Sequence, residues 1–152
     1  MSVHVQPLTE EHFEVFRDLI FALADYEELE RPDADAVDRL RADAFAEHPR
    51  FEAFLAWHNG AAIGYAICFE TYSSFLAKPS MYLEDLFVLE AHRNLGAGSA
   101  LFDHVLHLAS ERGCGRMEWQ VLDWNQLARD FYHKRNATWM EEWLPYRITL
   151  NP

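Results

Sequence analysis

The sequence contains little cysteine, no long hydrophobic run and few basic residues. Cys68 and Cys114 are too few to build the disulfide framework of a small secreted protein. No apolar stretch approaches the roughly 20 residues that span a bilayer, and residues 1–9 lack the basic start and apolar core of a secretory signal. These absences exclude a disulfide scaffold and predict a cytoplasmic protein that contacts no membrane.

Positive charge is scarce: 13 Lys and Arg face 25 Asp and Glu, which gives a formal net charge of −12. A field of this sign repels nucleic acid and attracts cations. The acidity serves either solubility alone or the recruitment of a cationic substrate. Charge by itself does not separate these two interpretations.

Apolar residues are abundant: half of the 152 residues are hydrophobic and 14% are aromatic, which is enough for one packed domain over residues 1–152. Hydrophobic periodicity and turn residues predict the order β-α-α-β-β-β-α-β-α-β-β. We expect an α/β fold with a mixed, mostly antiparallel sheet of six or seven strands, about four helices and a right-handed β-α-β crossover. The predicted strands are 3–7, 51–57, 61–69, 80–88, 116–122, 138–143 and 146–150; the helices are 9–26, 33–48, 96–112 and 125–134, and a polar loop occupies 71–79.

A glycine-containing loop, Arg93-Asn94-Leu95-Gly96-Ala97-Gly98, joins a predicted strand to a predicted helix. The first turn of a helix leaves backbone N–H groups unpaired, and residues without a Cβ let a phosphate approach them. Arg93 adds a positive charge, so the loop favours a pyrophosphate ligand. Two glycines at such a junction also serve simply to turn the chain. Neither the Rossmann nor the P-loop signature is present.

The loop resembles the R-x-x-G-x-G acyl-CoA signature of the GNAT superfamily of N-acetyltransferases, and the predicted order of elements is similar too. Further segments resemble the diamine (spermidine/spermine) and thialysine acetyltransferase branch. Together they cover nearly the whole chain and are specific in combination: residues 23–27, 47–49, 82–88, 93–99, 124–125 and 131–137.

The resemblance implies that acetyl-CoA is the co-substrate. Backbone groups of Leu86, Phe87 and Val88 would hold its pantetheine arm, and Asn125 would bond that arm from the other side. The amides of Asn94, Leu95, Gly96, Ala97, Gly98 and Ser99 would hold the pyrophosphate. Lys134 either meets the phosphates or lies on a solvated helix end. Asn94 and Asn136 replace glycines common in the family, and we expect both loops to form because asparagine tolerates left-handed backbone.

Acetyl transfer to an amine requires a base, because an alkyl ammonium has a pKa of about 10. Glu84 and Asp85 interrupt an apolar strand, where buried carboxylates are costly unless they serve a purpose. Adjacent strand residues face opposite sides, so only one can face a given site unless a bulge intervenes. The resemblance favours Glu84 as the base and Asp85 as a partner of the substrate cation. The alternative is that both lie on an exposed strand edge.

Tyr132 is the candidate acid that protonates the departing thiolate. It follows Asn125 by seven residues, close to two helical turns, so both side chains share one face of the predicted helix. The bare sequence is equally compatible with a core aromatic residue packed with Phe131. The resemblance of residues 131–137 to the family motif favours the catalytic interpretation.

An acidic segment supplies the candidate acceptor site. Residues 25–47 hold nine acidic residues against three basic ones, and Tyr26, Glu27 and Glu28 follow the first predicted helix. They would bind a small cationic amine such as a polyamine, diamine or lysine-like molecule, or form a solvated surface. His104 and His107 lack a third ligand, so no metal is expected.

The predicted activity is direct attack of an amine on acetyl-CoA in a ternary complex. The alternatives are a non-catalytic acyl-CoA-binding module and a protein-lysine acetyltransferase. The resemblance also implies a homodimer, and the net charge argues against a nucleic-acid partner.

Overall fold

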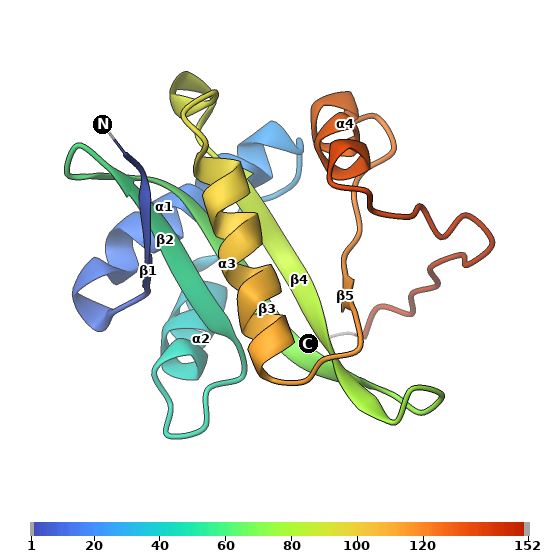
Figure 1. The fold of residues 1–152 in the computed structure, drawn as a ribbon. Helices are drawn as coiled ribbons and strands as arrows, with labels where there is room; N and C mark the ends of the chain where they lie inside the picture. The colour runs from blue at the N-terminus through green and yellow to red at the C-terminus, as the bar shows by residue number, and fades with distance from the viewer. Residues whose placement is uncertain (1, 151–152) are drawn as a thin grey trace. The chain divides into compact units, whose positions relative to one another are not determined.

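The computed structural model describes residues 2–150 (Figure 1). The chain divides into two compact units, and the boundary along the sequence falls between Trp119 and Gln120. The second unit contains one helix, α4 (Gln126–Lys134). The first unit contains two 3-10 turns, Glu10–His12 and Glu90–His92, and eight longer elements: β1 (His4–Pro7), α1 (Phe13–Tyr26), α2 (Ala34–Ala44), β2 (Glu52–His58), β3 (Ala61–Ser73), β4 (Lys78–Val88), α3 (Ala97–Glu111) and β5 (Met117–Glu118).

The five strands form one sheet in the order β1-β2-β3-β4-β5. Neighbours are antiparallel except β4 and β5, which run parallel and are connected through α3. This confirms the expected mixed, mostly antiparallel α/β sheet with four helices and a β-α-β crossover. The predicted number of six or seven strands is wrong by at least one.

The missing strands belong to the end of the chain. Residues 138–150 contain no strand, and the predicted strand over 116–122 shortens to Met117–Glu118. The apolar residues that alternate with polar ones in residues 138–150 are not buried: Trp143, Tyr146 and Ile148 are all exposed. An apolar side chain stabilises a strand only when one face of that strand is covered.

The predicted polar loop over 71–79 is also shorter than expected. The β3–β4 hairpin continues through the pairs Tyr72↔Pro79 and Ser73↔Lys78. Ser73 is buried despite its polarity, and polar composition therefore suggested a loop where cross-strand pairing extends the hairpin.

Helices cover both faces of the sheet (Figure 1). On one face α1 buries Phe13, Phe16 and Leu19 against sheet residues that include Leu55 and Tyr65. On the other face α3 buries its apolar stripe, and the ring of His104 lies 4.4 Å from that of Phe54. Phe54 and Leu55 thus point to opposite layers, as strand alternation requires.

Local signals set most helix ends. The Asp33 carboxylate accepts a hydrogen bond from the N–H of Ala36 at 2.8 Å and caps α2. Gly113, with φ +73°, follows the end of α3, which agrees with the predicted end of this helix at residue 112. Thr9 precedes a 3-10 turn and makes no side-chain cap. None of the helices in residues 2–150 is both long and apolar enough to cross a bilayer.

Candidate active site

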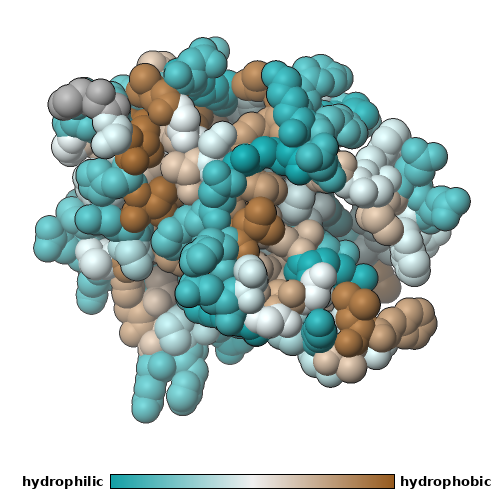
Figure 2. Space-filling model, in the orientation of Figure 1, coloured by the Kyte–Doolittle hydropathy of each residue, from teal (hydrophilic) through white to brown (hydrophobic). Residues whose placement is uncertain are grey.

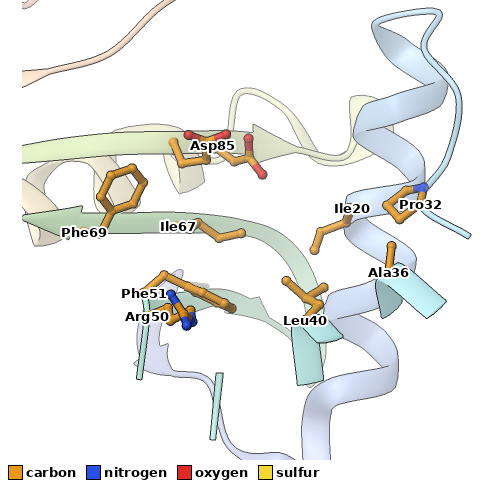
Figure 3. A pocket seen from close by; sticks show the side chains of 10 residues that line it. Ile20, Pro32, Ala36, Leu40, Arg50, Phe51, Ile67, Phe69 and Asp85 are labelled. Carbon is orange, nitrogen blue, oxygen red and sulfur yellow. The ribbon is translucent and has the colours of Figure 1, made fainter. Parts of the chain in front are cut away.

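A bulge in β4 brings two carboxylates to one cavity. Ile67 pairs with Asp85 and Cys68 with Leu83, so Glu84 is the extra residue of β4 at this point. Both Glu84 and Asp85 consequently line the same cavity, of about 390 Å³, although they are adjacent in sequence. Figure 3 labels Asp85 at this cavity. From the sequence, both acids could face one site only if a bulge intervened in the strand, and the structure contains that bulge.

The rest of the cavity is mostly apolar. Its walls come from α1, the segment before α2, α2 itself, the two residues before β2, and β3 (Figure 3). An apolar cavity with a few convergent polar groups is the usual form of a small-molecule site. The residues other than the two carboxylates are Ile20, Pro32, Ala36, Leu40, Arg50, Phe51, Ile67 and Phe69.

The environment of Asp85 changes its pKa. Burial raises its pKa to about 6, the hydrogen bond from Tyr65 opposes that rise, and the nearby charges of Glu84 and Glu27 add to it. The Tyr65 hydroxyl donates to Asp85 Oδ2 at 2.9 Å and is held in a side chain that is 0% exposed. Glu84, by contrast, is exposed. Asp85 thus has the proton affinity of a base poised near neutral pH.

Tyr65 was not identified from the sequence. It stands inside a run of buried strand residues, 62–68, whose other members are apolar or small. A buried tyrosine hydroxyl nearly always has a partner. A tyrosine within the apolar residues 62–68 therefore indicates that a polar partner lies near its hydroxyl, but the sequence does not identify that partner.

The end of α1 joins predicted acceptor residues to predicted cofactor residues. The ring of Tyr26 lies 6.1 Å from that of Phe87, and the Arg93 guanidinium lies 4.8 Å from the centre of the Tyr26 ring. Arg93 Nε also donates to the carbonyl of Val88 at 3.3 Å. A phosphate contact by Arg93 would therefore compete with these contacts. Glu27 follows Tyr26, and burial raises its pKa.

Glu28 and Asn94 have left-handed backbone. Glu28 is exposed at φ +58°, directly after α1. Asn94 has φ +68° and Asn136 has φ +63°, so the expectation that both asparagines adopt this conformation is confirmed. Gly96, at φ +85°, forms the N-cap of α3 in the same conformation.

The predicted cofactor loop lies at the exposed start of α3. Within it Asn94, Leu95 and Gly96 are exposed, and Ala97 is buried beneath them. β5 pairs with β4 only at Met81 and Tyr82. In the described chain, the edge of β4 that carries Leu86, Phe87 and Val88 on the β5 side therefore has no strand partner. An extended ligand can hydrogen-bond to such an edge.

The remaining candidates lie in the second unit. The Asn125 side-chain oxygen accepts from the N–H of Ala128 at 3.2 Å and caps α4. Tyr132 is half-buried, with its ring 5.6 Å from that of Phe131. Lys134 is exposed in the last turn of the helix. The grouping of these residues with Glu84 and with the α3 loop stays a prediction.

Metal chemistry has no candidate site in the part of the chain that the structure describes. Residues 2–150 contain no group of three or more His, Cys, Asp and Glu side chains that could hold an ion.

Comparisons with known proteins identify a family and several relatives. Residues 13–137 match the model of the Acetyltransferase (GNAT) family. L-ornithine N5-acetyltransferase NATA1 of Arabidopsis thaliana is 38% identical over 72% of this chain and 49% of its own length. Thialysine N-epsilon-acetyltransferase of Sus scrofa is 32% identical over 86% of this chain and 82% of its own length. An integron cassette protein from the mobile metagenome of V. cholerae has a TM-score of 0.83 at 25% identity, covering 99% of this chain and 94% of its own. The chain thus matches about half the length of the ornithine enzyme and most of the thialysine enzyme.

Proposed function

Because the chain belongs to the GNAT acetyltransferase family, we propose that it transfers an acetyl group from acetyl-CoA to the primary amine of a small cationic acceptor. The observation that carries this proposal is the β4 bulge, which turns Glu84 and Asp85 into one apolar cavity. The named relatives acetylate amines of ornithine and thialysine. That residues 1–152 act as one N-acetyltransferase domain is part of the same proposal.

The proposed binding site for acetyl-CoA lies along the edge of β4 on the β5 side. The edge beyond Tyr82 offers backbone groups to the pantetheine arm, and the start of α3 offers N–H groups and a positive dipole end to the pyrophosphate. A Cβ built on Gly96 meets no heavy atom within 4 Å, so the space above the loop is open. Residues 94–99, with Leu86, Phe87 and Val88, are the proposed contacts. The family resemblance also assigns Asn125 and Lys134 to the cofactor, and this assignment is part of the proposal.

The carboxylate pair removes the proton from the acceptor. A bound ammonium lies near two negative charges, and its neutral form attacks the acetyl carbonyl once the proton has passed to a carboxylate. The pKa of about 6 and the geometry of Asp85 support it as the base, with Glu84 as the partner of the ammonium. The family resemblance assigns the reverse roles. Single substitutions distinguish the two assignments.

Tyr132 completes the proposed mechanism. Its phenol donates a proton to the thiolate as the tetrahedral intermediate collapses, and direct attack in a ternary complex needs no acyl-enzyme. Cys68 does not compete as a nucleophile, because burial raises the pKa of its thiol to about 12. A homodimeric, cytoplasmic enzyme without a nucleic-acid or membrane partner remains the expected setting.

The decisive experiment follows thiol release from acetyl-CoA with spermidine, putrescine, cadaverine, ornithine, lysine and thialysine. We expect Asp85→Asn to lower kcat by about 10²- to 10⁴-fold, as loss of a general base does, and Glu84→Gln to raise KM for the amine more than it lowers kcat. Tyr132→Phe should lower kcat. His107→Gln, exposed on α3, is the control and should leave turnover unchanged.

The alternatives appear as distinct outcomes. Calorimetric uptake of CoA with no turnover of any amine indicates the non-catalytic acyl-CoA-binding module. Turnover of lysine-containing peptides alone indicates a protein-lysine acetyltransferase. No CoA uptake at all overturns the proposal.

A further inference from the structure

Arg50 differs from every other residue that lines the acceptor cavity. Among the ten described lining residues it is the only one with a basic side chain, whereas Glu84 and Asp85 are the acids. The two signs of charge come from different segments: Arg50 lies two residues before β2 and the acids lie on β4, and β3 separates β2 from β4 in the sheet. Figure 3 shows Asp85 on one side of Ile67 and Arg50 on the other. β2 and β4 lie two strand spacings apart, so their backbones are separated by about 10 Å across the sheet.

The Arg50 side chain is held by the end of α2. Its Nε lies 3.4 Å from Asp43 Oδ1, and its backbone N–H donates to the Asp43 carbonyl at 3.3 Å. The ion pair involves Nε and leaves the fork of terminal nitrogens as the group that can bind a carboxylate in a bidentate manner. The side chain is 80% exposed, which places this fork at the rim of the cavity.

Between the two charged ends the cavity is lined by hydrocarbon. Ile20 and Leu40 come from the helices, Phe51 directly precedes β2, and Ile67 and Phe69 come from β3. This lining suits methylene groups, since each buried CH₂ contributes about 0.8 kcal/mol. Across the cavity, a substrate would therefore meet first the carboxylates of Glu84 and Asp85, then hydrocarbon side chains, and then the guanidinium of Arg50.

We propose that Arg50 binds a carboxylate of the acceptor, and that the preferred substrates are amino acids with a terminal amine on an alkyl chain rather than diamines. The amine lies at Glu84 and Asp85, the alkyl chain lies along Ile67, and the carboxylate lies at the Arg50 fork. This inference rests on the proposed function and adds a specificity-determining residue to it.

Two pairs of acceptors isolate the carboxylate. Lysine and cadaverine have the same terminal amine and the same alkyl chain and differ only in the carboxylate, and so do ornithine and putrescine. The wild-type protein should use lysine and ornithine with kcat/KM about ten-fold above their decarboxylated partners. This factor reflects a charge-assisted contact weakened by solvent at the rim.

Three substitutions test whether Arg50 causes the preference. Arg50→Gln should remove it by lowering kcat/KM for lysine about ten-fold while leaving that for cadaverine unchanged. Arg39→Gln makes the same change of charge on an exposed position of α2 and should leave the preference intact. Asp43→Asn removes the competing carboxylate and should increase the preference for lysine.

The possible outcomes distinguish a failure of this inference from a failure of the proposed acetyltransferase function. Equal use of lysine and cadaverine by the wild type, or an Arg39→Gln effect as large as that of Arg50→Gln, overturns the role of Arg50 and leaves the acetyltransferase intact. If no amine is acetylated, the proposed function fails, and calorimetric titration of lysine and cadaverine still decides the inference. Lysine must then bind more tightly than cadaverine to the wild type and not to Arg50→Gln.

Discussion

At the scale of single residues, Tyr65 and Asp85 set the proton affinity of the cavity. The burial of Asp85 raises its pKa, whereas the hydrogen bond from Tyr65 favours the ionised carboxylate and lowers it. The Tyr65 hydroxyl stays protonated at neutral pH, because burial raises its own pKa well above the ordinary value. The ring of Phe16 packs against the Tyr65 ring in a T-shaped arrangement, with the ring centroids 5.5 Å apart. Tyr65 therefore acts on the reaction through Asp85.

Replacing Tyr65 by phenylalanine should move the pH dependence of acetyl transfer. Without the donor, the pKa of Asp85 rises further above 6, and the acidic limb of kcat/KM moves to higher pH by about one unit. The titration of the amine affects both proteins equally, so the difference between their profiles reports Asp85.

The matched control is Tyr72→Phe, the same change on the same strand at a side chain that is 69% exposed. Its profile should superimpose on that of the wild type. A Tyr65→Phe enzyme that loses rate equally at every pH would contradict the role assigned to the hydroxyl and indicate only a structural one.

At the scale of elements, the site depends on how closely β3 and β4 approach each other. A Cβ at Gly64 would lie 2.6 Å from the carbonyl oxygen of Phe87, a distance that a real Cβ does not tolerate against backbone. Gly64 therefore permits the pairing that presents Phe87 and Val88 along the edge of β4. The bulge at Glu84 lies farther along the same pair of strands and turns the acids into the cavity.

The two ends of α3 offer a matched test of the cofactor loop. Gly96 and Gly113 both have positive φ, +85° and +73°, and a Cβ at either meets no heavy atom within 4 Å. Alanine at either position should cost about 1–2 kcal/mol of stability, because the left-handed backbone is unfavourable for L-residues.

Only Gly96→Ala should also weaken CoA binding, by about ten-fold or more in calorimetry, since only Gly96 lies among the amides proposed to hold the pyrophosphate. Chemical denaturation measures the shared loss of stability. Equal affinity of both variants for CoA would argue against the α3 loop as the phosphate site.

An element could be predicted when the interactions that form it lie close together in the sequence. The turn at Asn59-Gly60, the cap at Asp33 and the apolar stripe of α3 are local signals, and the sequence predicted the strands and helices to which they belong. The strands expected in residues 138–150 do not form, since alternation predicts a strand only where a partner covers one face.

The site was predictable in part for the same reason. The acids Glu84 and Asp85 were identified because charge within an apolar strand is visible in a single segment. The bulge, the bond from Tyr65 and the place of Arg50 depend on register across three strands, which composition and periodicity do not encode.

At the scale of the whole molecule, acidity is the dominant property. The formal net charge is −12, and hydrophilic residues cover most of the face in Figure 2, with hydrophobic ones in separate patches between them. Acidic residues are dense around the acceptor cavity, where Glu27, Glu84 and Asp85 add their charges. Such a field raises the local concentration of cations and falls off with ionic strength.

Salt should therefore weaken the use of cationic acceptors in proportion to their charge. Between about 20 mM and 500 mM salt the screening length shrinks several-fold, so KM for putrescine, with two positive charges, should rise about two- to five-fold. KM for lysine, with one net positive charge, should rise less, and kcat should not change. Choline chloride in place of sodium chloride controls for binding of a specific cation. A flat KM for both acceptors would show that the acidity serves solubility alone, because attraction of a cationic substrate by this charge cannot survive such screening unchanged.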